Sequence, residues 1–165
     1  MKDFSKIKLI VFDFDGVFTD GKVLTDQNGT ESVICSRKDT LRFSELKNAG
    51  IKLAVISKEK NLIVKKRCEK MEIECFQSAD KKIDILKQLI ERENILVEET
   101  AFMGDDINDL ECLKFVGTAF TVADGDEECK KIAHYVTTRK GGDHAVREIC
   151  DLILKDRADN ILNNG

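Results

Sequence analysis

A short apolar segment that ends at two aspartates constrains this chain more than any other feature of its sequence. Residues 7–12 are apolar apart from one lysine, which predicts a strand buried on both faces of a sheet. Asp13 and Asp15 follow directly, separated by one phenylalanine, and Gly16 then permits a tight turn. If the strand's alternation continues, both carboxylates lie on the same side of the chain, where they repel each other unless a cation lies between them. The segment therefore predicts a polar, cation-binding site at the end of a buried strand.

The rest of the chain alternates between short apolar runs and amphipathic segments. Such alternation with short connections predicts an α/β fold, a doubly wound parallel sheet with helices on both faces. The predicted strands after the first are residues 51–56, 73–76, 100–104, 117–122 and 135–137, and the predicted helices are residues 39–49, 61–71, 80–93, a segment after 106 that ends at 115, 127–132 and 145–154. Ligands bind beyond the carboxyl ends of such strands. Asp13, Ser57 and Asp105 all stand at such ends, which predicts one shared site.

The segment between the first strand and the first helix has the pattern of a β-hairpin. Two short β-rich runs flank Asn28-Gly29, a dipeptide typical of tight hairpin turns. The hairpin spans about residues 21–35, too few for an inserted cap domain, so the predicted site would stand open in a monomer. The helix after it is predicted to turn Leu41 and Leu46 inward and to stop at Gly50.

Length and composition limit the classes of protein to consider. The 165 residues predict a single domain, residues 1–165, with a frayed polar tail at about 156–165. A net charge of −4 gives no basis for nucleic-acid binding. The apolar run before Asp13 is too short to span a membrane and lacks the order of a signal segment, so we expect a cytoplasmic protein. The six cysteines show no zinc-type spacing, which predicts reduced thiols in the core.

The residues from Asp13 to Gly21 resemble the first motif of the haloacid dehalogenase-like phosphatases, in the form D-x-D-G-V-x-T-D-G. This longer form is similar to that of the branch without a large cap domain, which includes the phosphatases of eight- and nine-carbon 2-keto-3-deoxy sugar acids. The resemblance covers about residues 7–154 and implies a Rossmann-like sheet with a small β-hairpin in place of a cap. It also implies an enzyme, a Mg²⁺-dependent phosphatase of octulosonate 8-phosphate or of a nonulosonate or acylneuraminate 9-phosphate.

The resemblance assigns catalytic roles to four residues. Hydrolysis of a phosphate monoester needs a nucleophile, a proton donor for the leaving oxygen, and positive charge near the phosphoryl oxygens. Asp13 would be the nucleophile that forms an aspartyl-phosphate, and Asp15 would protonate the leaving sugar oxygen and then activate water. Ser57 would bond a phosphoryl oxygen. Lys82 matches the lysine of the third motif, with Lys81 as the competing choice.

The metal site is implied by the same resemblance. Hard oxygen ligands near one another favour Mg²⁺. Asp105 matches the metal ligand of the fourth motif, and it would hold the ion together with Asp13 and the backbone carbonyl of Asp15. Asp106 and Asp109 would be supporting residues.

Substrate-binding residues are implied less directly. Lys38, Asp39 and Thr40 occupy the place of an R-D-G triplet in the sugar-acid phosphatases, so Lys38 and Asp39 are candidates for substrate binding. Lysine cannot make the bidentate contact of arginine with a carboxylate, and Arg37, one residue earlier, is an alternative.

Two further stretches bear on the identity of the sugar. Residues 57–59 (Ser-Lys-Glu) resemble the T-S-E of nonulosonate phosphatases more than the T-G-R of octulosonate enzymes, which makes Glu59 a third candidate for substrate binding. Residues 140–148 resemble a C-terminal G-G-x-G-x-x-R-E stretch, with His144 where glycine is expected.

The resemblance also implies partners and leaves rival interpretations. It implies a homotetramer in which each hairpin joins an inner barrel and neighbouring subunits help to cap each site. One rival is a non-catalytic assembly module of the kind attached to some acylneuraminate cytidylyltransferases, although retention of the aspartates argues against it. The other is a phosphoacceptor receiver domain, in which the acidic pair and the phosphorylated aspartate lie on different strands.

Overall fold

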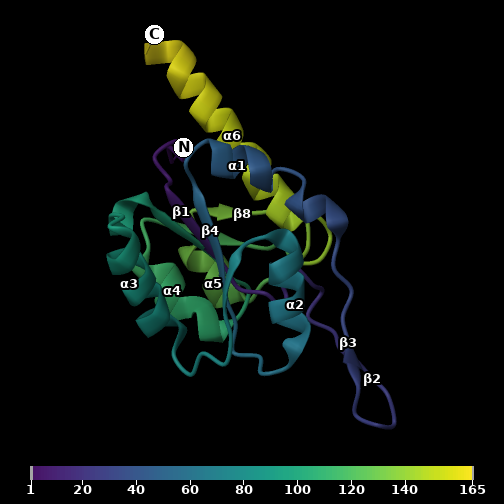
Figure 1. The fold of residues 1–165 in the computed structure, drawn as a ribbon. Coiled ribbons are helices and arrows are strands. Elements are labelled where there is room, and N and C mark those ends of the chain that lie inside the picture. The colour runs from purple at the N-terminus through teal and green to yellow at the C-terminus, as the bar shows by residue number, and fades with distance from the viewer. Residues whose placement is uncertain (1, 165) are drawn as a thin grey trace.

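The computed structural model describes residues 2–164, and its elements alternate between strands and helices (Figure 1). The strands are β1 (Leu9–Phe12), β2 (Leu24–Thr25), β3 (Glu31–Ser32), β4 (Lys52–Ile56), β5 (Glu74–Phe76), β6 (Thr100–Met103), β7 (Thr118–Thr121) and β8 (Tyr135–Val136). The α-helices are α1 (Phe43–Asn48), α2 (Leu62–Met71), α3 (Lys82–Glu93), α4 (Leu110–Phe115), α5 (Glu127–Ile132) and α6 (Ala145–Asn164), and short 3₁₀ turns cover Arg37–Thr40, Val97–Glu99 and Ile107–Asp109.

The main sheet has six parallel strands in the order β5-β4-β1-β6-β7-β8. Strand β1 is central, with β4 on one side and β6 on the other. The chain thus moves outward from β1 first in one direction and then in the other, so the strand order reverses there. This is the position at which open parallel sheets place their ligand sites. The predicted doubly wound parallel sheet is confirmed.

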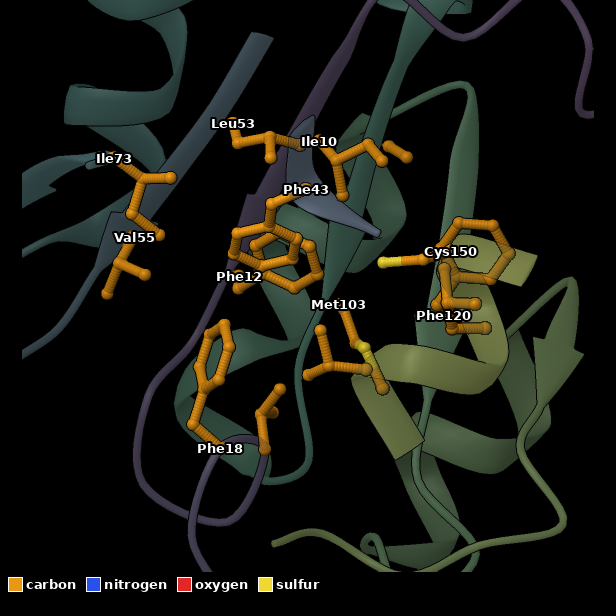
Figure 2. Packing of buried hydrophobic residues seen from close by; sticks show 14 of the residues in the cluster. Ile10, Phe12, Phe18, Phe43, Leu53, Val55, Ile73, Met103, Phe120 and Cys150 are labelled. Carbon is orange, nitrogen blue, oxygen red and sulfur yellow. The ribbon is translucent and has the colours of Figure 1, made fainter. Parts of the chain in front are cut away.

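Each face of the sheet carries its own apolar core. Residues at alternate positions of β1 face opposite cores: Ile10 and Phe12 pack with residues of α1, α2 and α6, whereas Leu9 and Val11 pack with residues of α3, α4 and α5. Figure 2 shows Phe43 of α1 lying over Phe12, with their ring centroids 6.0 Å apart. Burial on both faces explains why β1 reads as a continuous apolar run.

The turn after β1 is anchored in the first of these cores. Phe14, between the two aspartates, is fully buried, and its ring stacks on Phe18 at 5.7 Å between centroids. Phe18 in turn contacts Phe12 at 5.4 Å (Figure 2). Because the phenylalanines point into the core, the aspartates that alternate with Phe14 point the other way. The turn is therefore held by apolar packing on one side and is polar on the other.

Two segments extend from this body at opposite ends (Figure 1). One is the β2–β3 hairpin, whose strands pair in antiparallel register. The other is the C-terminal part of α6, which continues ten residues past the predicted end at residue 154. The tail that was predicted to be frayed is helical through residue 164, and residue 165 lies outside the described residues.

The first predicted helix differs from the structure. Residues 37–40 form a 3₁₀ turn and α1 begins only at Phe43, so Phe43 and Leu46 are buried and Leu41 is exposed. The prediction that Leu41 faces the core is wrong, because the break between the two helical segments rotates Leu41 outward.

In residues 2–164, no helix combines the length and apolar character needed to cross a membrane.

Candidate active site

An open cavity of about 300 Å³ lies at the carboxyl ends of the central strands. Asp13 follows β1 directly, Ser57 follows β4 directly, and Asp105 lies two residues after β6. The lining residues are Asp13, Asp15, Gly21, Ser57, Lys58, Glu59, Lys82, Asp105, Asp106 and Asn108. The structure thus brings together the residues that the sequence placed at strand ends.

A buried lysine lies at the floor of the cavity between two carboxylates. The Nζ atom of Lys82 is 2.6 Å from Oδ1 of Asp13 and 2.8 Å from Oδ1 of Asp109, and all three side chains are buried. Lys82 occupies the first residue of α3, whereas its neighbour Lys81 is exposed. Burial alone would lower the pKa of Lys82, but the two carboxylates raise it, so the side chain carries a positive charge.

Asp109 holds this arrangement in place through two hydrogen bonds that it accepts. Its Oδ1 accepts a hydrogen bond from Lys82, and its Oδ2 accepts one from the backbone N–H of Asp105 at 3.1 Å. A Cβ at Gly104 would lie only 2.5 Å from Cγ of Asp109, so glycine is required for the chain to pass this close. Asp109 therefore positions both Lys82 and the loop that carries Asp105.

Three carboxylates meet closely enough to share a cation. Among residues 2–164, oxygens of Asp13, Asp105 and Asp109 lie within 4.8 Å of one another. Oδ1 of Asp105 is buried and has no hydrogen-bond partner within the described chain. A buried carboxylate oxygen without a partner is costly, and a divalent cation would satisfy it. Asp15 is outside this group of side chains, and the resemblance assigns only its backbone carbonyl to the metal.

The electrostatics of the cavity reflect this crowding. Burial and the Asp109 carboxylate raise the pKa of Asp13 well above its usual range, against the opposing effect of Lys82. Burial, with the neighbouring carboxylates of Asp109 and Asp106, raises the pKa of Asp105 to about 7. One ammonium thus does not balance the acidic groups, and the cavity favours additional positive charge.

The rim of the cavity carries a carboxyl group and a hydroxyl. Asp15 is half-buried, and burial followed by the charge of Glu59 raises its pKa. Ser57 is buried, and its Oγ accepts a hydrogen bond from the backbone N–H of Glu59 at 3.1 Å. The Ser57 hydroxyl hydrogen is therefore free to point at a ligand oxygen.

Two predicted substrate-binding residues lie elsewhere. Asp39 is fully buried, and its Oδ1 accepts a hydrogen bond from the backbone N–H of Arg147 near the start of α6. Lys38, on the same 3₁₀ turn, is exposed. Neither belongs to the cavity lining of the described chain, so their placement does not support the prediction that they bind substrate in this cavity.

Sequence reasoning missed other residues of the site. Lys58 and Asn108 line the cavity, although neither is among the site residues predicted from the sequence. Their positions in the sequence could have identified them, because Lys58 directly follows Ser57 and Asn108 lies three residues after Asp105. Gly141 and Gly142 were also given no role, although both pack against the turn that follows β1.

Comparison with known proteins finds a family and several relatives. A family model described as haloacid dehalogenase-like hydrolase matches residues 38–149. The 3-deoxy-D-manno-octulosonate 8-phosphate phosphatase of Escherichia coli strain K12 is 34% identical over 149 residues, which cover 90% of this chain and 79% of that protein.

Two solved structures are similar over nearly the whole chain. The 3-deoxy-D-manno-octulosonate 8-phosphate phosphatase of Moraxella catarrhalis, in complex with magnesium, phosphate and KDO, has a TM-score of 0.90 at 33% identity and covers 98% of this chain and 95% of its own. The cobalt-bound phosphatase of Haemophilus influenzae has a TM-score of 0.90 at 32% identity and covers 95% of this chain and 92% of its own.

Proposed function

The chain belongs to the haloacid dehalogenase-like hydrolases and is a phosphatase of the 3-deoxy-D-manno-octulosonate 8-phosphate phosphatase type, and from this premise we propose that it hydrolyses the phosphomonoester of a 2-keto-3-deoxy sugar acid. The observation that carries the proposal is the pairing of Asp13 with Lys82 at 2.6 Å on the floor of an open cavity. A carboxylate oriented by an ammonium at a strand end is a suitable nucleophile for a phosphorus atom, and the same ammonium offsets the charge of the phosphoryl oxygens.

The donor set supports a Mg²⁺ cofactor. Asp13 and Asp105 supply hard carboxylate oxygens, one of them without a partner in the described chain, and the backbone carbonyl of Asp15 is the third ligand that the resemblance implies. When bound, Mg²⁺ would neutralise charge on the carboxylates and on the phosphoryl oxygens. Relatives from Moraxella catarrhalis and Haemophilus influenzae contain magnesium and cobalt, respectively.

The chain's own residues divide the reaction into two displacements. In the first, a carboxylate oxygen of Asp13 attacks phosphorus, the bond from phosphorus to the sugar oxygen breaks, and Asp15 gives its proton to that oxygen. In the second, Asp15 takes a proton from water, the water oxygen attacks phosphorus, and the bond to Asp13 breaks to release inorganic phosphate. Lys82 holds Asp13 in place throughout, and the Ser57 hydroxyl donates to a phosphoryl oxygen.

Two chain lengths of sugar acid are candidates. The relatives named above act on an eight-carbon acid, which supports octulosonate 8-phosphate. Glu59, the residue that resembles the nonulosonate phosphatases, lines the cavity beside Asp15, which supports a nine-carbon 9-phosphate as the second candidate. We place octulosonate 8-phosphate first because whole-chain similarity outweighs one position.

The rival interpretations receive less support. A non-catalytic assembly module would have no need for Asp13, Asp15, Lys82 and Asp105 to converge on one cavity. In a receiver domain the acidic pair lies on a different strand from the phosphorylated aspartate, whereas here Asp13 and Asp15 both follow β1.

Phosphate release with Mg²⁺ tests the proposal. The panel holds octulosonate 8-phosphate, a nonulosonate and an acylneuraminate 9-phosphate, and a hexose 6-phosphate, and we expect strong preference for one sugar acid. Asp13→Asn keeps the shape of the side chain but removes the nucleophile, so turnover should fall by about 10⁴-fold or more with the fold intact. Asp84→Asn, on the exposed face of α3, is the matched control and should retain activity.

Two outcomes would contradict the proposal. Substantial activity of a clean Asp13→Asn preparation would exclude the covalent mechanism. No turnover of any compound by folded wild-type protein would favour the assembly-module interpretation instead.

We also propose a homotetramer built around the hairpins, with neighbouring subunits covering each cavity. Support comes from the family resemblance and from three exposed apolar side chains on or beside the hairpin, Val23, Leu24 and Ile34, which are 46%, 74% and 86% exposed in the single chain. Burial of such side chains against another subunit would be favourable.

A further inference from the structure

The loop before α6 packs directly against the backbone of the turn that follows β1. The N–H of Gly142 donates to the carbonyl oxygen of Val17 at 3.0 Å. A Cβ at Gly141 would overlap the carbonyl group of Gly16, approaching its carbon to 2.6 Å, and a Cβ at Gly142 would lie 2.7 Å from the backbone N of Asp20. Gly142 also has φ = +72°, which favours glycine. Backbone therefore lies on backbone here, and no larger residue fits.

The same turn contacts a carboxylate of the cavity on its other side. Gly16 has φ = +83°, and a Cβ at this position would overlap the carboxylate of Asp105, whose Oδ1 would be 2.8 Å away. The Asp105 side chain thus rests against the Cα of Gly16. Gly16 and the Asp105 carboxylate are therefore in direct contact, so a displacement of Gly16 would also displace that carboxylate.

A third loop, residues 122–126 between β7 and α5, links these two contacts into a closed set. The N–H of Asp126 donates to the carbonyl oxygen of Asp105 at 2.7 Å. From the same loop, Oδ1 of Asp124 accepts a hydrogen bond from the N–H of Gly141 at 2.9 Å. Gly141, Gly16, Asp105, Asp126 and Asp124 therefore form a ring of contacts, which we call the glycine ring.

We propose that Gly141 is a positioning residue for the metal site, because the glycine ring fixes Gly16 and, through Gly16, the carboxylate of Asp105. The inference rests on the proposed function, since it assumes that Asp105 binds the metal. Gly141 lies 36 residues beyond Asp105 and is not among the residues that line the cavity. Its effect reaches the site through packed backbone, which transmits small displacements because protein interiors are close-packed.

Metal affinity without substrate tests this inference. In Gly141→Ala the new methyl group must push Gly16 away, so we expect Mg²⁺ affinity, measured by calorimetry, and Mn²⁺ affinity, measured by electron paramagnetic resonance, to weaken by about 10–100-fold. Gly117→Ala is the matched control: its Cβ would lie 2.5 Å from Cα of Glu98. Both variants lose stability, but only Gly141→Ala should lose metal affinity.

A second pair of variants decides the matter if Gly141→Ala does not fold. Asp124→Ala removes the acceptor of the Gly141 N–H without adding a clash, whereas Asp124→Asn keeps the Oδ1 acceptor and removes only the charge. We expect weaker metal binding in the alanine variant and near wild-type binding in the asparagine variant. Equal binding in all variants, or equal loss in both Asp124 variants, would overturn the inference. Failure of wild-type protein to bind either metal would instead overturn the metal site of the proposed function.

Discussion

Asp39 is a buried carboxylate, and only one of its two oxygens accepts a hydrogen bond from the part of the chain that the structure describes. Oδ1 accepts the N–H of Arg147 at 3.3 Å, while Oδ2 has no partner in the part of the chain that the structure describes. Burial raises the pKa of Asp39 to about 6, and the Arg147 N–H and the charges of His144 and Arg67 only partly oppose it. At neutral pH the protein therefore carries a buried negative charge that is incompletely satisfied.

We predict that Asp39→Asn stabilises the protein at pH 8. In wild type the folded state holds the Asp39 proton up to about pH 6, whereas the unfolded chain releases it near pH 4, so stability falls as pH rises through this window. Asparagine keeps the acceptor but has no charge, and the free energy of unfolding at pH 8 should rise by about 1–3 kcal/mol. Urea unfolding at pH 4.5 and pH 8 should show that the gain shrinks at the lower pH. A gain of the same size at both pH values, or none at pH 8, would contradict this account.

At the scale of single residues, the sequence predicted which side chains follow the strands and meet at the cavity, whereas their catalytic roles stay predictions. Asp13, Asp15 and Ser57 could be placed because a strand end fixes the position of the next residue. The choice between Lys81 and Lys82 could not be made, since it depends on the exact residue at which α3 begins. His144, where glycine was expected, has φ = +69°, a conformation that only the packed structure reveals.

Helix α6 is held to the segments that precede β1 and β4 by side-chain hydrogen bonds, two of which come from Arg157. Arg157 donates to the carbonyl oxygens of Ala49 at 2.8 Å and Ile7 at 2.6 Å, which belong to the segments just before β4 and β1. Farther along the helix, Ile161 and Leu162 are exposed. Asn160 also donates a hydrogen bond to Oγ of Ser5 at 2.7 Å, so Arg157 and Asn160 together hold this part of the helix to the body.

We predict that Arg157→Met lowers the free energy of unfolding by about 2–3 kcal/mol, because hydrogen bonds from a charged group to two partly buried backbone carbonyls are lost. Arg92→Met is the control, since Arg92 makes ion pairs with Glu74 and Glu93 but is half exposed, and its loss should cost less than about 1 kcal/mol. Urea unfolding measures both. Equal effects of the two substitutions would show that Arg157 is not a structural tie.

At the scale of elements, strands were easier to predict than helix ends. The buried strands can be recognised as apolar runs bounded by polar residues, and they alternate with helices along the chain. The end of α6 was placed at residue 154 because the apolar pattern fades there, yet the helix continues, and the side chains of Arg157 and Asn160 hydrogen-bond it to the body. The first helix began later than predicted because residues 37–40 form a 3₁₀ turn and α1 starts only at Phe43.

In a single chain, the apolar side chains on and beside the β2–β3 hairpin are exposed to water. We therefore predict that the protein assembles into a tetramer that buries them. Light scattering after gel filtration should give four times the mass of one chain at micromolar concentration. Ile34→Asp should shift the protein to smaller species, because a charge would be buried at the interface. Leu162→Asp, equally exposed but on α6, should not. A monomeric wild type, or the same shift in both variants, would contradict assembly through the hairpin.

The central position of β1 also affects how the chain is made. Leu9 pairs with Lys52 on one side and with Thr100 on the other, so β1 obtains its second neighbour only when residues 100–103 have emerged from the ribosome. Until then the nascent chain carries an apolar strand with an open edge, and open edges of this kind pair readily with other chains. The strand that leads into Asp13 and Asp15 is therefore exposed to mispairing with other chains until β6 has been synthesised.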